Sequence, residues 1–189
     1  MNGVGSVLAA FGLSASAGLN AYIPLLIVSL MARFTNWVTL SEPWDALSSW
    51  WVIGALTILT LIEFFADKFP AVNHVNDVVQ SFVRPAAGAV LFAASTGAAT
   101  QIHPVVAIIA GLVVAGSVHA TKALAIRPAV TATTAGAGNI PISILEDVVA
   151  AVLSILAVVV PVLIAALIIV VTAFVVWWLW RRANQTQTA

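Results

Sequence analysis

Long apolar runs, separated by short polar segments, constrain the fold of this chain more than any other feature of its sequence. Of its 189 residues, 62% are hydrophobic and only 7% are charged, whereas soluble domains carry about 25% charged residues. Several runs approach or reach the roughly 20 apolar residues that a helix needs to cross the hydrocarbon of a bilayer. The sequence therefore predicts a polytopic membrane protein, folded as one integral-membrane domain over residues 1–189.

Six segments are predicted to be transmembrane helices of an all-α bundle, because Gly, Pro or polar clusters separate most of these apolar runs. They cover residues 7–31, 50–66, 86–101, 104–124, 144–159 and 162–180. Only Pro161 separates the last two segments, so one kinked helix is the alternative there. The 37 residues from 144 to 180 would form a helix of about 55 Å, which is too long for a single span.

The positions of lysine and arginine predict the orientation of the chain, because cytoplasmic loops carry an excess of both residues. With the short polar tail 181–189 in the cytoplasm, six of the seven basic residues fall on that side and only Arg33 falls outside. We therefore predict a multi-pass protein of the cell (cytoplasmic or inner) membrane with both termini in the cytoplasm. Tryptophans within 37–51 and 177–180 suit the two membrane interfaces.

The stretch EFFADKFPAVNHVNDVVQSFVRPA, residues 63–86, gathers much of the charge of the chain. Glu63 lies inside an apolar run, where an ionised carboxylate that faced lipid would be costly. Asp67 follows at i+4 on the same helix face, with Lys68 next to it, so these side chains can form one local charged cluster.

Residues 71–84 separate apolar and polar side chains onto opposite faces at helical spacing. Asp77 and Arg84 lie on the polar face, and His74 falls in the same stretch. The pattern predicts a short amphipathic helix that rests in the membrane interface or folds back as a re-entrant element. Pro85 suits the first turn of the following span, because the start of a helix does not use the missing N–H group.

The fourth predicted span ends in a stripe of small and ionisable residues. Gly111, Ala115, His119 and Lys122 follow one another at spacings of 4, 4 and 3, which places them on one helix face. Small residues allow close helix packing, so this face is predicted to point into the bundle, with Arg127 beyond it. His119 then has either a structural hydrogen bond or a titrating or binding role, and the sequence leaves both open.

Two other segments combine polar groups with breaks in the apolar pattern. In GLSASAGLNAYIP, Asn20 and its Ser, Gly and Pro neighbours predict a kinked or broken helix that serves solute binding or helix contacts. In TATTAGAGNIPISILEDVV, Asn139 precedes Glu146 and Asp147, which are predicted at a helix N-terminus where the dipole favours acids. This Gly-rich loop is a connector or an anion-binding turn, although it matches neither common phosphate-binding fingerprint.

Four blocks, in chain order, carry a family resemblance: GLSASAGLNAYIPLL, EFFADKFPAVNHVNDVVQSFVRPAAGA, HATKALAIRPAVTATTAGAGN and LEDVV. Together they look like an uncharacterised bacterial integral-membrane family, domain of unknown function 4126. The resemblance covers nearly the whole chain. It implies a membrane fold and brings no established substrate or reaction.

The ionisable side chains within apolar segments point to transport, because such residues mark solute or proton pathways. We predict a small membrane transporter or lipid translocator with a polar cavity on the cytoplasmic side. Its bases would hold an anionic solute or headgroup, and its acids or histidine would exchange protons. The candidate substrate-binding or proton-relay residues are Asn20, Glu63, Asp67, Lys68, His74, Asp77, Arg84, His119, Lys122, Arg127, Asn139, Glu146 and Asp147.

Two other functions stay open. A membrane enzyme that acts on lipid phosphate headgroups could use the same charges, but its motifs are mostly missing and the sequence leans away from an enzyme. A structural or assembly protein would use the charges only as internal salt bridges. No cofactor and no metal are expected. A formal net charge of zero, without a long basic tract, excludes nucleic acid and leaves the bilayer, an anionic ligand and a second copy of the chain as partners.

Overall fold

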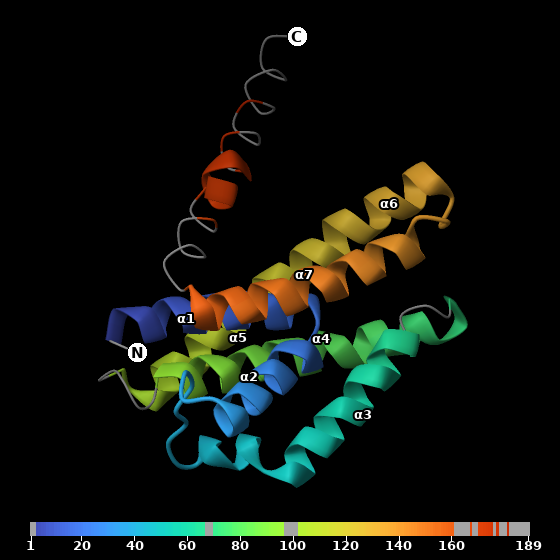
Figure 1. Ribbon diagram of the computed structural model, residues 1–189. Helices are drawn as coiled ribbons and strands as arrows, with labels where there is room; N and C mark the ends of the chain where they lie inside the picture. The colour runs from blue at the N-terminus through green and yellow to red at the C-terminus, as the bar shows by residue number, and fades with distance from the viewer. Residues whose placement is uncertain are drawn as a thin grey trace.

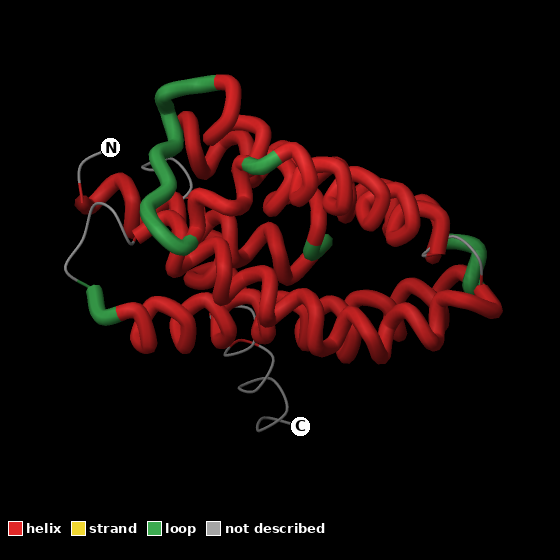
Figure 2. Tube along the Cα trace, turned by 90° about the horizontal axis from the view of Figure 1, so that it is seen from below, coloured by secondary structure: helices red, strands yellow, loops and turns green. Residues whose placement is uncertain are grey.

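The computed structural model describes residues 3–66, 70–96 and 102–160, with further positions at 167, 170–175, 177 and 181. The side chains of residues 70–75 and 77 are outside this description. Every regular element in the described part is a helix (Figure 2). The predicted all-α class is confirmed, whereas most of the predicted span 162–180 and of the tail 181–189 lies outside the described residues.

Up to residue 160, the described part contains nine helical elements, labelled in Figure 1 where there is room. They are α1 (Gly3–Leu19), α2 (Tyr22–Phe34), the 3-10 helix η1 (Trp44–Ser48), α3 (Trp50–Ala66), α4 (Pro70–Thr96), α5 (Pro104–Thr121), the π-turn η2 (Lys122–Ile126), α6 (Arg127–Thr134) and α7 (Asn139–Val159). Three described stretches are long and apolar enough to cross a membrane: Val78–Thr96, Pro104–Thr134 and Asn139–Val159. The helices α1, α2 and α3 are shorter apolar helices.

The predicted first span, 7–31, is not a single helix. α1 ends at Leu19 and α2 begins at Tyr22, and α2 runs back toward the end of the molecule at which α1 begins (Figure 1). The prediction of a broken helix in this segment is confirmed. The prediction that the segment crosses the bundle is corrected, because the two helices form a hairpin with its tip at Asn20.

Contacts with α7 give the direction of each helix of the hairpin. Ser16, near the end of α1, donates a hydrogen bond of 2.7 Å to the carbonyl oxygen of Ala150, and Asn20 reaches Asp147. Trp37, just beyond α2, lies beside Val158 near the other end of α7. α1 is therefore antiparallel to α7 and α2 is parallel to it, so both open ends of the hairpin lie at the same end of the bundle.

The predicted break before Pro85 is also absent. Residues 70–96 form one helix, α4, with Pro85 in its interior, and the expected separate amphipathic helix at 71–84 is the first half of this helix. Proline removes one backbone hydrogen bond from a helix interior. Tertiary contacts outweigh that loss here, because the preceding residue, Arg84, is fully buried and ion-paired.

The predicted span 104–124 continues further than expected. α5, η2 and α6 form an uninterrupted helical stretch from Pro104 to Thr134, and the turn between α6 and α7 occupies only residues 135–138. Ala135 and Gly136 adopt positive φ angles of 51° and 87° in this turn. The Gly-rich segment is therefore a tight connection between two long helices that project at the same end as the α3–α4 connection (Figure 1).

Small residues allow α1, α4 and α5 to pack closely at the middle of the bundle. Ser14 of α1 donates a 2.9 Å hydrogen bond to the carbonyl oxygen of Gly88 in α4. A methyl group at Gly111 of α5 would lie 2.7 Å from the Cα atom of Ala89 and closer still to the Gly88 carbonyl oxygen. α4 and α5 therefore meet backbone to backbone at these glycines.

We expect Gly111→Ala to lower the stability of the bundle by about 1–3 kcal/mol, because the added methyl group meets backbone atoms that cannot move aside. Gly54→Ala is the matched control, since a methyl group at Gly54 has no neighbour within 4 Å. The midpoint of thermal unfolding in detergent should fall for the first variant and stay level or rise for the second. Equal midpoints for Gly111→Ala and the wild type would contradict the close packing.

Candidate functional site

Charged side chains from separate helices converge on the tip of the α1–α2 hairpin, in the interior of the bundle. Three are carboxylates, three are Lys or Arg, and one is histidine. We call this set the charged centre: Glu63, Arg84, His119, Lys122, Arg127, Glu146 and Asp147. All are buried except Arg127, whose side chain is 12% exposed. The charged centre is electrically balanced when the histidine is neutral.

Glu63, Arg84 and His119 form one half of the charged centre, where α3, α4 and α5 meet. Arg84 Nη2 lies 3.0 Å from Glu63 Oε1, and both side chains are fully buried. Arg84 Nη1 lies 3.3 Å from His119 Nδ1, and Ser81 Oγ lies 3.2 Å from His119 Nε2. The guanidinium group thus bridges a carboxylate and an imidazole.

This geometry defines the protonation state of His119. A guanidinium group can only donate hydrogen bonds, so His119 Nδ1 accepts from Arg84. The proton of the imidazole is then on Nε2, which donates to Ser81 Oγ. His119 is therefore neutral in this arrangement, and a second proton on its ring would break the contact with Arg84.

Lys122, Arg127 and Glu146 form the other half, where η2, α6 and α7 meet. Lys122 Nζ and Arg127 Nη2 lie 2.7 and 3.5 Å from the same atom, Glu146 Oε2. The first distance is that of a charge-assisted hydrogen bond, although its angles are poor, and Glu146 Oε1 has no hydrogen-bond donor in the described part of the chain. Charge attraction is therefore the main interaction that holds this carboxylate. Arg127 Nη2 also donates to Ser143 Oγ at 3.1 Å.

The π-turn explains why Lys122 and Arg127 reach the same carboxylate. The N–H group of Arg127 bonds to the carbonyl oxygen of Lys122, five residues earlier. In a regular α-helix, residues five apart point about 140° away from each other. The wider π-turn returns the chain toward the starting face, and such turns are frequent at functional sites.

The hairpin tip is tied to the charged centre through its backbone and through Asn20. Asn20 Oδ1 accepts hydrogen bonds from the N–H groups of Tyr22 and Ile23, at 3.1 and 3.0 Å, and so caps the start of α2. Asn20 Nδ2 donates to Asp147 Oδ1 at 2.9 Å. Lys122 Nζ donates to the carbonyl oxygen of Leu19 at 3.0 Å. Polar side chains thus bind the last carbonyl oxygen of α1 and the first N–H groups of α2.

The structure brings together eight of the thirteen predicted site residues, namely the charged centre and Asn20. Asp67 and Lys68 lie outside the described residues, and the side chains of His74 and Asp77 are not described. Asn139 does not join the charged centre. It accepts a hydrogen bond from Thr131 at the α6–α7 turn, about 10 Å along the helix from Glu146.

The interpretation of Glu146 and Asp147 as helix-terminal acids is wrong. α7 begins at Asn139, and no acidic residue lies in its first turn. Both acids are two turns inside the helix, where the dipole effect has faded. Basic and amide groups from other helices stabilise them instead.

Sequence reasoning missed Ser81 and Ser143, whose hydroxyl groups form hydrogen bonds with His119 and Arg127. A spacing signal for Ser143 exists, since it precedes Glu146 by three residues and shares its buried face. The same kind of signal exists for Ser81, which precedes Arg84 by three residues on α4.

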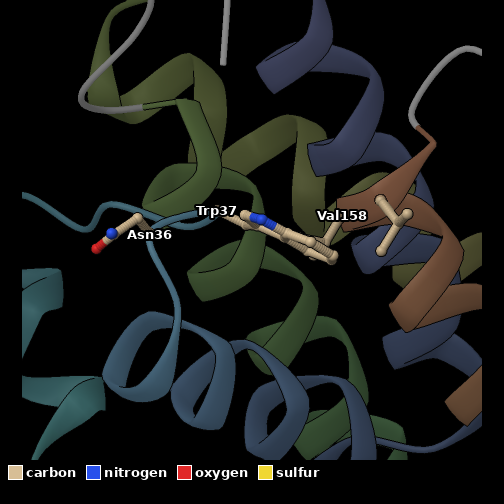
Figure 3. A pocket seen from close by; sticks show the side chains of 4 residues that line it. Asn36, Trp37 and Val158 are labelled. Atoms are coloured by element: carbon tan, nitrogen blue, oxygen red, sulfur yellow. The ribbon is translucent and has the colours of Figure 1, made fainter.

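A separate surface cavity of about 360 Å³ lies where the hairpin opens, away from the charged centre. It is lined by Asn36, Trp37, Val158 and Val159, and Figure 3 shows the Trp37 ring directed toward Val158. None of these residues is ionisable. Along α7, Val158 is about 18 Å from Glu146. In the described part of the chain, no three His, Asp or Glu side chains are arranged so that they could hold a metal ion together.

Comparison with known proteins identifies one family. A family described as domain of unknown function (DUF4126) matches residues 7–182. No curated protein and no solved structure matches the chain.

We expect Glu63→Gln to destabilise the protein by about 3–5 kcal/mol, because it removes a fully buried carboxylate from its ion pair with Arg84. The double variant Glu63→Gln/Arg84→Met should recover part of the loss, since no uncompensated charge is then left at this pair. Thermal unfolding of both variants in detergent measures the difference. An unchanged midpoint for Glu63→Gln would show that the pair contributes little.

Proposed function

The chain belongs to the family of domain of unknown function 4126, and from the geometry of its interior we propose that it is a small membrane transporter or lipid translocator for an anionic solute or headgroup. The observation that carries this proposal is the charged centre at the tip of a broken helical hairpin. Discontinuous helices in membrane proteins expose backbone groups at the depth where transporters bind their substrates.

The cost of the charged centre supports a functional role. Ionised groups within a membrane bundle are expensive, and well-packed apolar residues often stabilise a protein as much as a buried ion pair or more. Here the charges meet at the hairpin tip, where Lys122 holds the end of α1 and Asn20 links the start of α2 to Asp147. A change of charge at the centre would therefore act on both helices of the hairpin.

The electrical balance of the charged centre supports proton coupling. An anion that enters without a proton would leave an uncompensated negative charge in a medium of low polarity, which is costly. One proton taken up in the centre removes this cost. His119 and the carboxylates are the groups that can accept it, and His119 is neutral before it does so.

The lysine and arginine bias favours an orientation with the α3–α4 and α6–α7 connections on the cytoplasmic side of the inner membrane. The charged centre would then lie on the cytoplasmic side of the hairpin tip. Because residues 7–31 return to the end from which they came, the same bias places the start of α1 outside. This replaces the expectation that both termini lie in the cytoplasm.

A structural role is the second candidate, and the balance of three carboxylates against three Lys or Arg side chains favours it. In that case the charges serve only to fix the helices in one arrangement. Measurements of stability and of flux distinguish the two candidates. If the centre is purely structural, substitutions in it lower the stability of the protein, and the wild-type protein transports no solute.

Proteoliposomes that contain a pH-sensitive dye test the transport proposal. We expect inorganic phosphate, sulfate or a fluorescent anionic lipid to move across the membrane, with proton entry, faster than in protein-free vesicles. His119→Gln or Glu146→Gln should abolish the proton movement, because each variant removes a group that can accept the proton. Glu42→Gln, in the loop between α2 and η1, is the control and should behave as wild type. Wild-type rates equal to those of empty vesicles for every probe would overturn the proposal.

A further inference from the structure

We infer that Lys122 and Arg127 form an oxyanion-binding site whose internal occupant is the carboxylate of Glu146. A phosphate- or sulfate-like group of the substrate would replace this carboxylate, and Glu146 would take up a proton from water as it leaves the two bases. The inference rests on the proposed transport function for its biological meaning. It specifies the substrate class, the residues that bind it and the group that carries the proton.

The arrangement of the bases supports an oxyanion site. Two cations from different helical elements, η2 and α6, converge on one oxygen atom, at 2.7 and 3.5 Å. Ser143 Oγ accepts a hydrogen bond from the same Arg127 nitrogen, and its hydroxyl proton remains available to an acceptor. The Leu19 carbonyl oxygen holds Lys122 in place. An arginine fork beside a lysine suits a group with several anionic oxygens.

The way in which Glu146 is held makes it replaceable. Its side chain is only 8% exposed, yet Oε1 has no hydrogen-bond donor in the described part of the chain, and Oε2 is held by close but poorly directed contacts with the two bases. Buried carboxylates normally form hydrogen bonds, which offset the cost of removing their charge from water. A carboxylate with few hydrogen bonds is therefore less well stabilised. A tetrahedral oxyanion presents more acceptor oxygens to Lys122, Arg127 and Ser143 than this carboxylate uses.

Charge balance requires the proton. If Glu146 left the bases as a carboxylate, it would be buried without compensation, which is costly. Lys122 on η2 and Arg127 on α6 contact Glu146, Arg84 on α4 acts on Lys122, and Asp147 follows Glu146 in α7. Neutralisation of Glu146 by one proton offsets one negative charge of the arriving anion. Binding of the anion should therefore strengthen as the pH falls.

Sulfate is the probe for this site, because its charge does not change across the tested pH range. We measure its affinity by calorimetry on the purified full chain in detergent. Wild-type affinity should rise by up to about tenfold per pH unit as the pH is lowered from about 8 to about 6. Glu146→Gln should bind sulfate about tenfold more tightly than wild type at the higher pH, equivalent to about 1.4 kcal/mol, and should lose most of the pH dependence.

Asp147→Asn tests position against charge, since it neutralises the next carboxylate on α7 without removing the occupant of the two bases. It should keep the pH dependence and raise the affinity for sulfate less than Glu146→Gln does. Lys122→Met and Arg127→Gln should each lose sulfate binding, and Lys122→Arg should restore it. If Lys122→Met does not fold, the sulfate affinities of Arg127→Gln and of Glu146→Gln, each compared with wild type, still test the oxyanion site.

Competition identifies the source of the oxyanion. Displacement of sulfate by a short-chain phosphatidic acid but not by glycerol phosphate would indicate a lipid headgroup, and displacement by both would indicate a soluble anion. The inference is overturned if neither wild type nor Glu146→Gln binds sulfate, or if Asp147→Asn raises the affinity as much as Glu146→Gln. Solute flux in vesicles without sulfate binding would overturn this inference alone and leave the transport proposal intact.

Discussion

The cost of placing ionised groups inside an apolar bundle governs the architecture of this protein. Each buried charge needs an opposite charge or strong hydrogen bonds within reach, because no water or headgroup compensates it there. Glu63, Arg84, Lys122 and Glu146 belong to four helical segments that are distant in sequence. Their pairing therefore restricts how α3, α4, η2 and α7 can be arranged around one another.

The same requirement applies to the backbone at the broken helix. The last carbonyl groups of α1 and the first N–H groups of α2 have no partners within their own helices. Lys122 satisfies the carbonyl oxygen of Leu19, and Asn20 caps α2. The hairpin tip can therefore lie in the interior of the bundle. It lies next to the charged centre, which supplies hydrogen-bonding partners for its backbone and for Asn20.

Close helix packing makes these distances possible. The contact of Gly88 with Gly111 draws α4 and α5 together, one turn along α4 from Arg84, which faces His119 of α5. Ser14 of α1 forms a hydrogen bond with α4, and Ser16 of α1 forms one with α7. Van der Waals contact and interhelical hydrogen bonds replace the hydrophobic effect as the force between such helices. The proposed binding chemistry depends on this scaffold, because the charged groups are held by helices and not by loops.

The sequence by itself determined the class of the protein, the approximate positions of its apolar helices, the break near Asn20 and the inward face that carries His119 and Lys122. These follow from hydropathy and periodicity, which are properties of neighbouring residues. Only the tertiary structure decided that the chain turns back at Asn20, that α4 continues through Pro85, and which acid pairs with which base. The physical reason is that these outcomes depend on contacts between segments far apart in the chain, where the cost of an unpaired polar group outweighs local preference.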